Sequence, residues 1–202
     1  MANEISYWGL RPVRHINGSS WNGLTERCYI AAAYETALYV GDPVAVVTGV
    51  DATAFHTSIN LAGLTDGEVI YGVITSFEST IDMNDRWVKK PASVEAYANV
   101  CTDPTVVYHI RDDGTVDPPL YTWAFCNAEM SAGTSSAITG LSGIGILGTS
   151  VVANDQSLPL IIIRRADLPD NALSINAIWE VMINTCQLLN GGAGNALGIA
   201  KV

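Results

Sequence analysis

Short runs of alternating apolar and polar residues, separated by turn-forming residues, limit most strongly what this chain can fold into. In residues 105–111, for example, apolar side chains at every second position alternate with His109 and Arg111, as in a strand with one buried face. Residues 112–114 follow with Asp-Asp-Gly, a hairpin-type turn signal. Helix-length amphipathic patterns are nearly absent. The chain is therefore predicted to be mainly β.

Similar runs recur along the whole chain. They are 27–32, 43–50, 69–77, 93–101, 160–165 and 177–184. In the last run Glu180 and Asn184 are expected to face outward, against an apolar inner face. Strands spaced at about ten residues and bounded by Gly, Pro, Asn and Asp favour an antiparallel sandwich or small barrel, of which the jelly roll is one form, with few short helices.

The first 24 residues are expected to form an extended N-terminal arm. Their apolar residues follow no period, and glycines and Pro12 interrupt any regular element. Tryptophan, tyrosine and arginine are enriched at the energetic centres of protein interfaces. The candidate contact residues, with a partner protein or between subunits, are Tyr7, Trp8, Arg11, Arg14, His15 and Trp21. The alternative is that the segment folds back over the chain's own core with its aromatic rings inward.

Residues 25–186 are predicted to form a single β-rich domain, since 202 residues can bury a core without disulfides or metal ions. Within it, 127–148 is rich in Gly and Ser and poor in charge, which indicates a long loop or insertion that lies against something. Residues 85–90 with Pro91 have the charges of a protected sheet edge. Residues 187–202 are expected to be a flexible tail.

The composition limits the kinds of partner that the protein is expected to bind. A formal net charge of −10 disfavours contact with nucleic acid or an anionic membrane. Hydrophobic residues make up 49% and charged residues only 15%, a balance expected when neighbouring subunits cover much of the surface. The apolar stretches are too short to cross a bilayer, and no secretion signal is recognised. Self-association as a homodimer or homotrimer is expected.

Two sequence patterns associated with metal or cofactor sites lack the context that such sites need. The four cysteines Cys28, Cys101, Cys126 and Cys186 have no ligand or thiol-exchange spacing, so buried free thiols are expected. Residues 143–148 match the letters GxGxxG, but no βαβ frame surrounds them. A glycine-rich loop explains this segment better than a dinucleotide site.

Acidic and histidine residues give no stronger signal. Asp103, Asp112, Asp113 and Asp117 lack the ligand spacing of a calcium loop and are explained by turn chemistry. The three histidines, His15, His56 and His109, lie far apart in the sequence and accompany no catalytic signature. No catalytic residue, metal ion or cofactor is therefore expected, and the protein is predicted not to be an enzyme.

Several blocks taken together carry a resemblance. They are residues 9–23, 36–44, 72–78, 100–114, 137–143 and 176–184. In this order they resemble tailed-bacteriophage virion structural proteins of the capsid decoration, or cement, type. The resemblance implies a protein made in the host bacterial cytoplasm that binds the outer surface of the icosahedral head. There it clamps adjacent subunits of the major capsid protein and stabilises the shell.

Three other functions stay open at the level of the sequence. A virion protein of the tail or neck is the nearest. A carbohydrate- or receptor-binding β-sandwich would present Trp87, Tyr121 or Trp123 as exposed stacking platforms. A hydrolase on a β scaffold would need a pocket with convergent polar groups.

Overall fold

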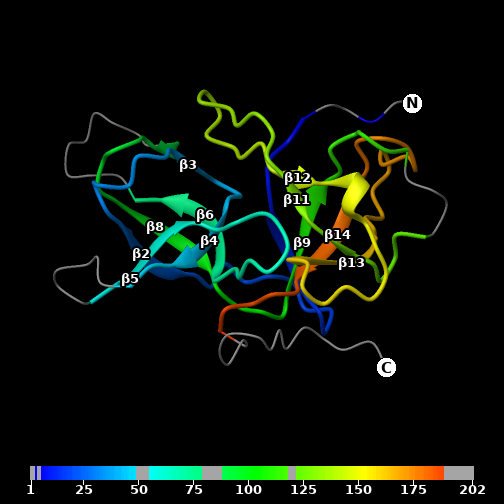
Figure 1. The fold of residues 1–202 in the computed structure, drawn as a ribbon, viewed down its shortest axis with the longest axis horizontal. Coiled ribbons are helices and arrows are strands. Elements are labelled where there is room, and N and C mark those ends of the chain that lie inside the picture. The colour runs from blue at the N-terminus through cyan, green and yellow to red at the C-terminus, as the bar shows by residue number, and fades with distance from the viewer. Residues whose placement is uncertain (1–2, 4–5, 49–54, 79–87, 118–121, 189–202) are drawn as a thin grey trace.

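Two β units lie side by side in the computed structural model, a barrel and an open sheet (Figure 1). The structure describes residue 3 and residues 6–48, 55–78, 88–117 and 122–188. Within this part of the chain, the helical content is one 3-10 turn, η1 (Gly148–Ser150). The prediction of a mainly β chain with a small barrel is confirmed.

The barrel is built from consecutive parts of the chain. Its strands are β2 (Glu26–Ile30), β4 (Pro43–Val46), β5 (Thr57–Leu61), β6 (Gly72–Phe77) and β8 (Ala96–Cys101). They pair in the order β2-β5-β4-β6-β8, and β8 returns to β2 to close the ring. All pairs are antiparallel except β2 with β5. Gly72 permits the close approach of β6 to β8, because a Cβ there would lie 2.5 Å from the carbonyl oxygen of Cys101.

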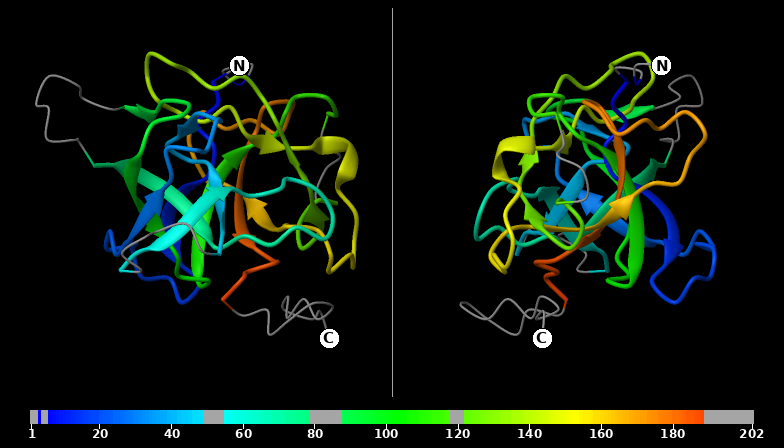
Figure 2. Two further views of the ribbon diagram at one scale, coloured as in Figure 1. Left: turned by 60° about the vertical axis from the view of Figure 1, so that its left-hand side comes forward. Right: turned by 90° about the vertical axis from the view of Figure 1, so that its right-hand side faces the viewer.

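The open sheet combines strands from both ends of the chain. Its strands are β1 (Arg11–His15), β9 (Val106–Arg111), β14 (Ile178–Ile183), β13 (Leu160–Arg165) and β10 (Asn127–Ala128), in that spatial order and all antiparallel. Two short pairs flank the main elements. They are β11 (Met130–Ser131) with β12 (Gly145–Ile146), and β3 (Leu38–Tyr39) with β7 (Lys89–Lys90). Figure 2 shows β1 lying beside β9 at one side of this sheet.

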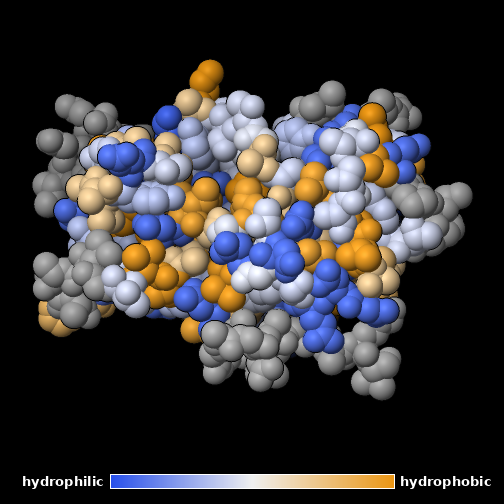
Figure 3. All heavy atoms as spheres, viewed as in Figure 1, coloured by the Kyte–Doolittle hydropathy of each residue, from blue (hydrophilic) through white to orange (hydrophobic). Residues whose placement is uncertain are grey.

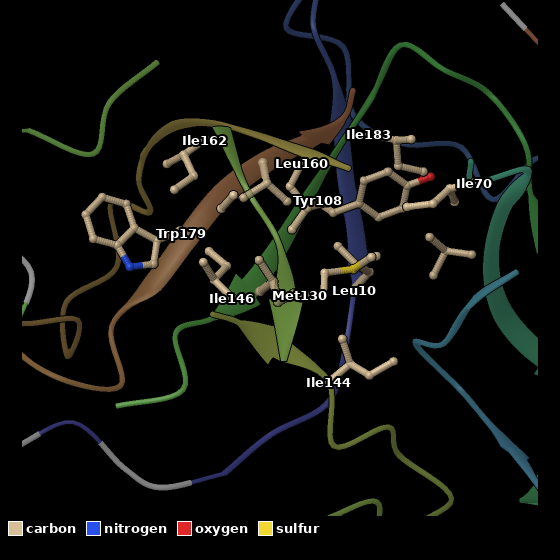
Figure 4. Close-up of a cluster of buried hydrophobic side chains, with 14 of the residues drawn as sticks. Leu10, Ile70, Tyr108, Met130, Ile144, Ile146, Leu160, Ile162, Trp179 and Ile183 are labelled. Atoms are coloured by element: carbon tan, nitrogen blue, oxygen red, sulfur yellow. The ribbon is translucent and has the colours of Figure 1, made fainter. Parts of the chain in front are cut away.

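One hydrophobic core joins the two units. Tyr108, Leu160 and Trp179 come from the open sheet, and the same cluster includes Ile70 and Val73 from the barrel side. Figure 4 shows the Tyr108 ring pointing toward Ile70 and Ile183, away from Trp179 at the other end of the cluster. A second cluster, mostly aliphatic, fills the barrel. Barrel and sheet therefore pack as one body.

The predicted strands are found, but three side chains that were expected to face outward are buried. Residues 160–165 form β13, and the runs at 105–111 and 177–184 contain β9 and β14. Arg111, Glu180 and Asn184 were expected to face solvent, yet they are 7%, 5% and 7% exposed. The three predictions were wrong because other segments cover these side chains. The Asn184 side-chain amide donates to the carbonyl oxygens of Gln156 and Leu158. The Trp8 ring lies over the Arg111 guanidinium, and arginines enclose Glu180.

The charged edge predicted at 85–90 is also different in the part that the structure describes, which begins at residue 88. Lys90 is completely buried rather than exposed. Its Nζ donates to the carbonyl oxygens of Tyr34 at 2.7 Å and Thr36 at 3.3 Å. Burial lowers the pKa of Lys90. Lys90 therefore anchors the 34–36 turn to β7 instead of guarding an edge.

The described part of the expected N-terminal arm is extended but belongs to the folded body. β1 pairs with β9 along its length, and Leu10 is 1% exposed. After a turn, the chain returns so that the Trp21 N–H donates to the carbonyl of Val13 at 3.3 Å. These contacts correspond to the second possibility noted for this segment, folding back over its own core. The tail from residue 189 onward lies outside the described residues.

Candidate functional site

A groove of about 980 Å³ runs along β1, between the barrel and the open sheet. The N-terminal segment supplies Trp8 and Val13 to its wall, and the barrel supplies Ile74. Ile178 of β14 and Leu168, from the segment between β13 and β14, also line it. Arg11 and His109 are its ionisable lining residues, and none of the described residues that line it is acidic. In a chain with a net charge of −10, this groove is an apolar surface with a basic margin.

The three aromatic candidates of the N-terminal segment contact their own chain. The Tyr7 hydroxyl donates to Oδ1 of Asn176 at 3.2 Å. The centre of the Trp8 ring lies 4.6 Å from Cζ of Arg111, a cation–π contact. Trp21 packs, partly buried, against the larger core. Trp8 and Trp21 also face the groove.

The basic candidates meet a buried carboxylate on the outer face of the open sheet. Arg14 Nη2 lies 2.6 Å from Glu180 Oε2, and Arg164 Nε lies 2.9 Å from the same oxygen. The strand register places Arg11 opposite His109, His109 opposite Glu180 and Glu180 opposite Arg164. We call this set the charged row; it consists of Arg11, Arg14, His109, Arg164 and Glu180.

The charged row has a net positive charge. Burial acts to raise the pKa of Glu180, but hydrogen bonds from Arg164 and Arg14 outweigh it and lower the pKa. Burial lowers the pKa of His109, and the charges of Arg11 and Arg14 lower it further against the opposing effect of Glu180. At neutral pH the row therefore combines three cationic guanidinium groups with one carboxylate and a neutral imidazole.

The sixth candidate, His15, does not form a catalytic relay. Its Nδ1 lies 3.4 Å from Asp103 Oδ2 and 3.3 Å from Thr105 Oγ1. A triad needs the acid and the hydroxyl on opposite ring nitrogens, so that the imidazole can pass a proton between them. Here both neighbours lie at one nitrogen, and the Thr105 hydroxyl donates to Asp103 at 2.7 Å. The arrangement fixes the turn before β9.

Other sites considered from the sequence have structural roles in the described residues. No group of three or more His, Cys, Asp or Glu residues there is placed to hold a metal ion. All four cysteines are free and buried, as predicted, and burial raises the pKa of Cys28 to about 12. Within the same ranges, no helix is long and apolar enough to span a membrane.

The aromatic platform considered for a sugar-binding protein is not exposed at the position that the structure describes. Trp123 is 4% exposed, and its ring centre lies 5.1 Å from that of Trp179. Trp87 and Tyr121 lie outside the described residues. The stacking surface expected at Trp123 is therefore a core contact.

The sequence reasoning missed Arg164 and Glu180, which complete the charged row. A signal was present, because Glu180 interrupts an otherwise apolar run, and a charge at such a position requires a partner when it is buried. The sequence pattern could not identify the partners, because Arg14 lies 166 positions away from Glu180.

The fold is mainly β, and its groove is lined mostly by apolar side chains, together with Arg11 and His109. No known family matches this chain, and neither a curated protein nor a solved structure matches it.

Proposed function

We propose that this protein is a virion structural protein of a tailed bacteriophage, a capsid decoration protein that binds the outside of the head and clamps adjacent major capsid subunits. The resemblance of the sequence blocks, which extend from residue 9 to residue 184, is the basis of the proposal. The structural observation that supports it is the display of large apolar side chains on separate loops. Ile138 is 90% exposed, Phe55 85% and Leu24 68%. Such side chains are typical of protein contacts rather than of an enclosed site.

The charged row is the proposed contact with the coat. Arg11 is exposed, and the Arg164 side chain is 58% exposed, although Glu180 holds its guanidinium. A guanidinium group can donate two parallel hydrogen bonds to a carboxylate of the coat, which fixes the orientation of the contact. Because the rest of the chain is acidic, this face is the favoured approach for a negatively charged surface.

The test is co-sedimentation with undecorated, expanded shells of the phage whose genome carries the gene. Deleting residues 1–23 would remove β1 from the open sheet, so point substitutions are the sharper probe. We expect saturable binding at a fixed ratio to coat protein, weakened about tenfold by Arg11→Glu and by raised salt. Lys89→Glu, a charge reversal in β7 on the barrel side, is the matched control and should bind as the wild type does.

Absence of shell binding would contradict the proposal. If the folded full-length chain does not bind shells at any concentration, it is not a decoration protein, and a tail or neck station becomes the next hypothesis. Equal binding of the Arg11→Glu and Lys89→Glu variants would remove the charged row from the contact.

A further inference from the structure

A loop formed by residues 132–143 projects from the body between β11 and β12 (Figures 1 and 2). Residues 131–154, which include it, carry no charged side chain. Ile138 lies in this loop and is 90% exposed. The loop stands out from this face of the molecule with an apolar tip (Figure 3). It is an uncharged projection on an acidic protein.

The loop is held in shape by its own hydrogen bonds. The Ser136 N–H donates to the carbonyl of Leu141, and the Gly140 N–H donates to the carbonyl of Ser136, both at 2.9 Å. The Ser136 hydroxyl oxygen accepts from the N–H of Thr139 at 3.2 Å. Ile138 therefore sits inside a closed turn, so little conformational entropy remains to be lost when its side chain is buried by a partner.

The base of the loop is fixed to residues that adjoin the β3–β7 pair. The Val40 N–H donates to the carbonyl of Gly140, and the Ser142 N–H donates to the carbonyl of Val40, both at 2.9 Å. Gly140 has φ +72°, and a Cβ there would collide with the carbonyl of Val88. These contacts hold the loop in a defined position relative to the groove.

The projecting loop and the groove meet at Leu141. This residue closes the loop turn and also lines the groove, as Leu168 does. An apolar projection therefore lies next to an apolar recess. A two-fold axis close to Leu141 would place the projection of each copy at the recess of the other, in the self-complementary arrangement that closed dimers require.

The charges of the two surfaces permit a second copy as the occupant. Two chains with a net charge of −10 each repel one another, and this repulsion is weakest where the facing surfaces carry no acidic group. The loop has no charged residue, and no described residue that lines the groove is acidic. The Arg11 side of the groove adds positive charge facing an acidic copy.

We propose that two copies of this chain form a two-fold dimer in which Ile138 of each copy inserts into the groove of the other, against Trp8, Val13 and Leu168. The inference specifies the self-association expected from the sequence, and it does not depend on coat binding. The charged row on the sheet face remains outside the exchanged contact except at Arg11 and His109.

Sedimentation velocity of the full chain over a concentration series tests the dimer. We expect the wild type to dimerise and both Ile138→Asp and Leu168→Asp to raise the dissociation constant by tenfold or more, since each places a carboxylate in an apolar contact. Ile175→Asp is the matched control, because Ile175 is 45% exposed and does not line the groove. It should dimerise as the wild type does.

A cross-link gives the second measurement. Ile138→Cys combined with Leu168→Cys should form a covalent dimer on oxidation, whereas each single variant should not, because the four native cysteines are buried. A wild type that stays monomeric or forms a trimer, or an Ile138→Asp variant that dimerises like Ile175→Asp, would overturn the inference. Since no shells are present, such a failure leaves the coat-binding proposal to its own test.

Discussion

The barrel and the open sheet differ in how the edges of their strands are paired. In the barrel, β8 returns to β2, so every strand has two neighbours, and the cluster that fills it is mostly aliphatic. An ion pair of the barrel, Arg27 with Glu78 at 2.8 Å, lies on the outside. The open sheet ends at β1 and β10, and buried polar side chains complete its hydrogen bonding. A closed ring therefore leaves no strand edge unpaired, whereas the open sheet has two edges.

Asp112 illustrates how the open sheet is completed. Its carboxylate lies just beyond β9, with no exposed surface, and accepts hydrogen bonds from the Asn176 N–H at 2.7 Å and the Gly114 N–H at 3.0 Å. It also accepts from Trp179 Nε1 at 3.2 Å. Burial raises the pKa of Asp112, although these hydrogen bonds act in the opposite direction. The side chain thus ties the end of β9 to the start of β14.

The largest effect is expected from Asp112→Ala, just beyond β9 in the open sheet. It leaves three buried donors without an acceptor, and we expect a loss of about 3 kcal/mol in the free energy of unfolding. Asp113→Ala is the control, because the neighbouring carboxylate is only partly buried and caps a turn through Thr115; it should cost about 1 kcal/mol. Denaturant unfolding followed by tryptophan fluorescence measures both. Equal losses would show that Asp112 is an ordinary turn residue.

The next comparison sets a buried carboxylate of the sheet against an exposed one of the barrel. Glu180→Gln leaves Arg14 and Arg164 around a neutral group, and we expect a loss of about 2 kcal/mol, reduced from the fully buried case by the exposure of Arg164. Glu78→Gln removes an exposed ion pair and should cost under about 1 kcal/mol. Urea unfolding of the two variants measures both losses of unfolding free energy. A larger loss for Glu78→Gln than for Glu180→Gln would contradict the expectation that the buried carboxylate contributes more to stability.

The smallest effect is a change in how stability depends on pH. Burial raises the pKa of Asp42, at the corner of the barrel before β4, from 3.8 to about 6, against hydrogen bonds from Ser142 and the Tyr39 N–H. The folded state therefore binds this proton more tightly than the unfolded state does, and this contribution to stability falls as pH rises from about 4 to 6. Glu180 has the opposite sign, because its pKa is lowered and its contribution is lost as pH falls below its ordinary value of 4.5.

Two variants separate these opposing contributions. Asp42→Asn should remove the decline between pH 4 and 6, and Glu180→Gln should reduce the loss of stability in acid. Thermal unfolding at a series of pH values measures both slopes. If Asp42→Asn leaves the wild-type profile between pH 4 and 6 unchanged, the carboxyl is not desolvated as described.

The sequence predicted the elements better than their surroundings. Alternation located β9, β13 and β14, because a strand with one buried face leaves a local pattern. It did not predict the burial of Arg111 or Glu180, because their covers, Trp8 and Arg14, are distant in the sequence. The groove could not be predicted from the sequence either, because it forms only where β1 passes the barrel. Local periodicity reports one face of a strand and carries no information on what covers the other.

The order of strands in the open sheet also sets the order in which the protein can be completed during synthesis. All barrel strands lie between Glu26 and Cys101, so the ribosome releases them as one uninterrupted stretch. β1 emerges before any of them, yet its partner β9 follows the whole barrel, and β14 ends only at Ile183. Domains fold as their chains become available, and contacts between distant residues form slowly. The earliest strand to leave the ribosome must therefore wait, unpaired, until the barrel beside it has been made.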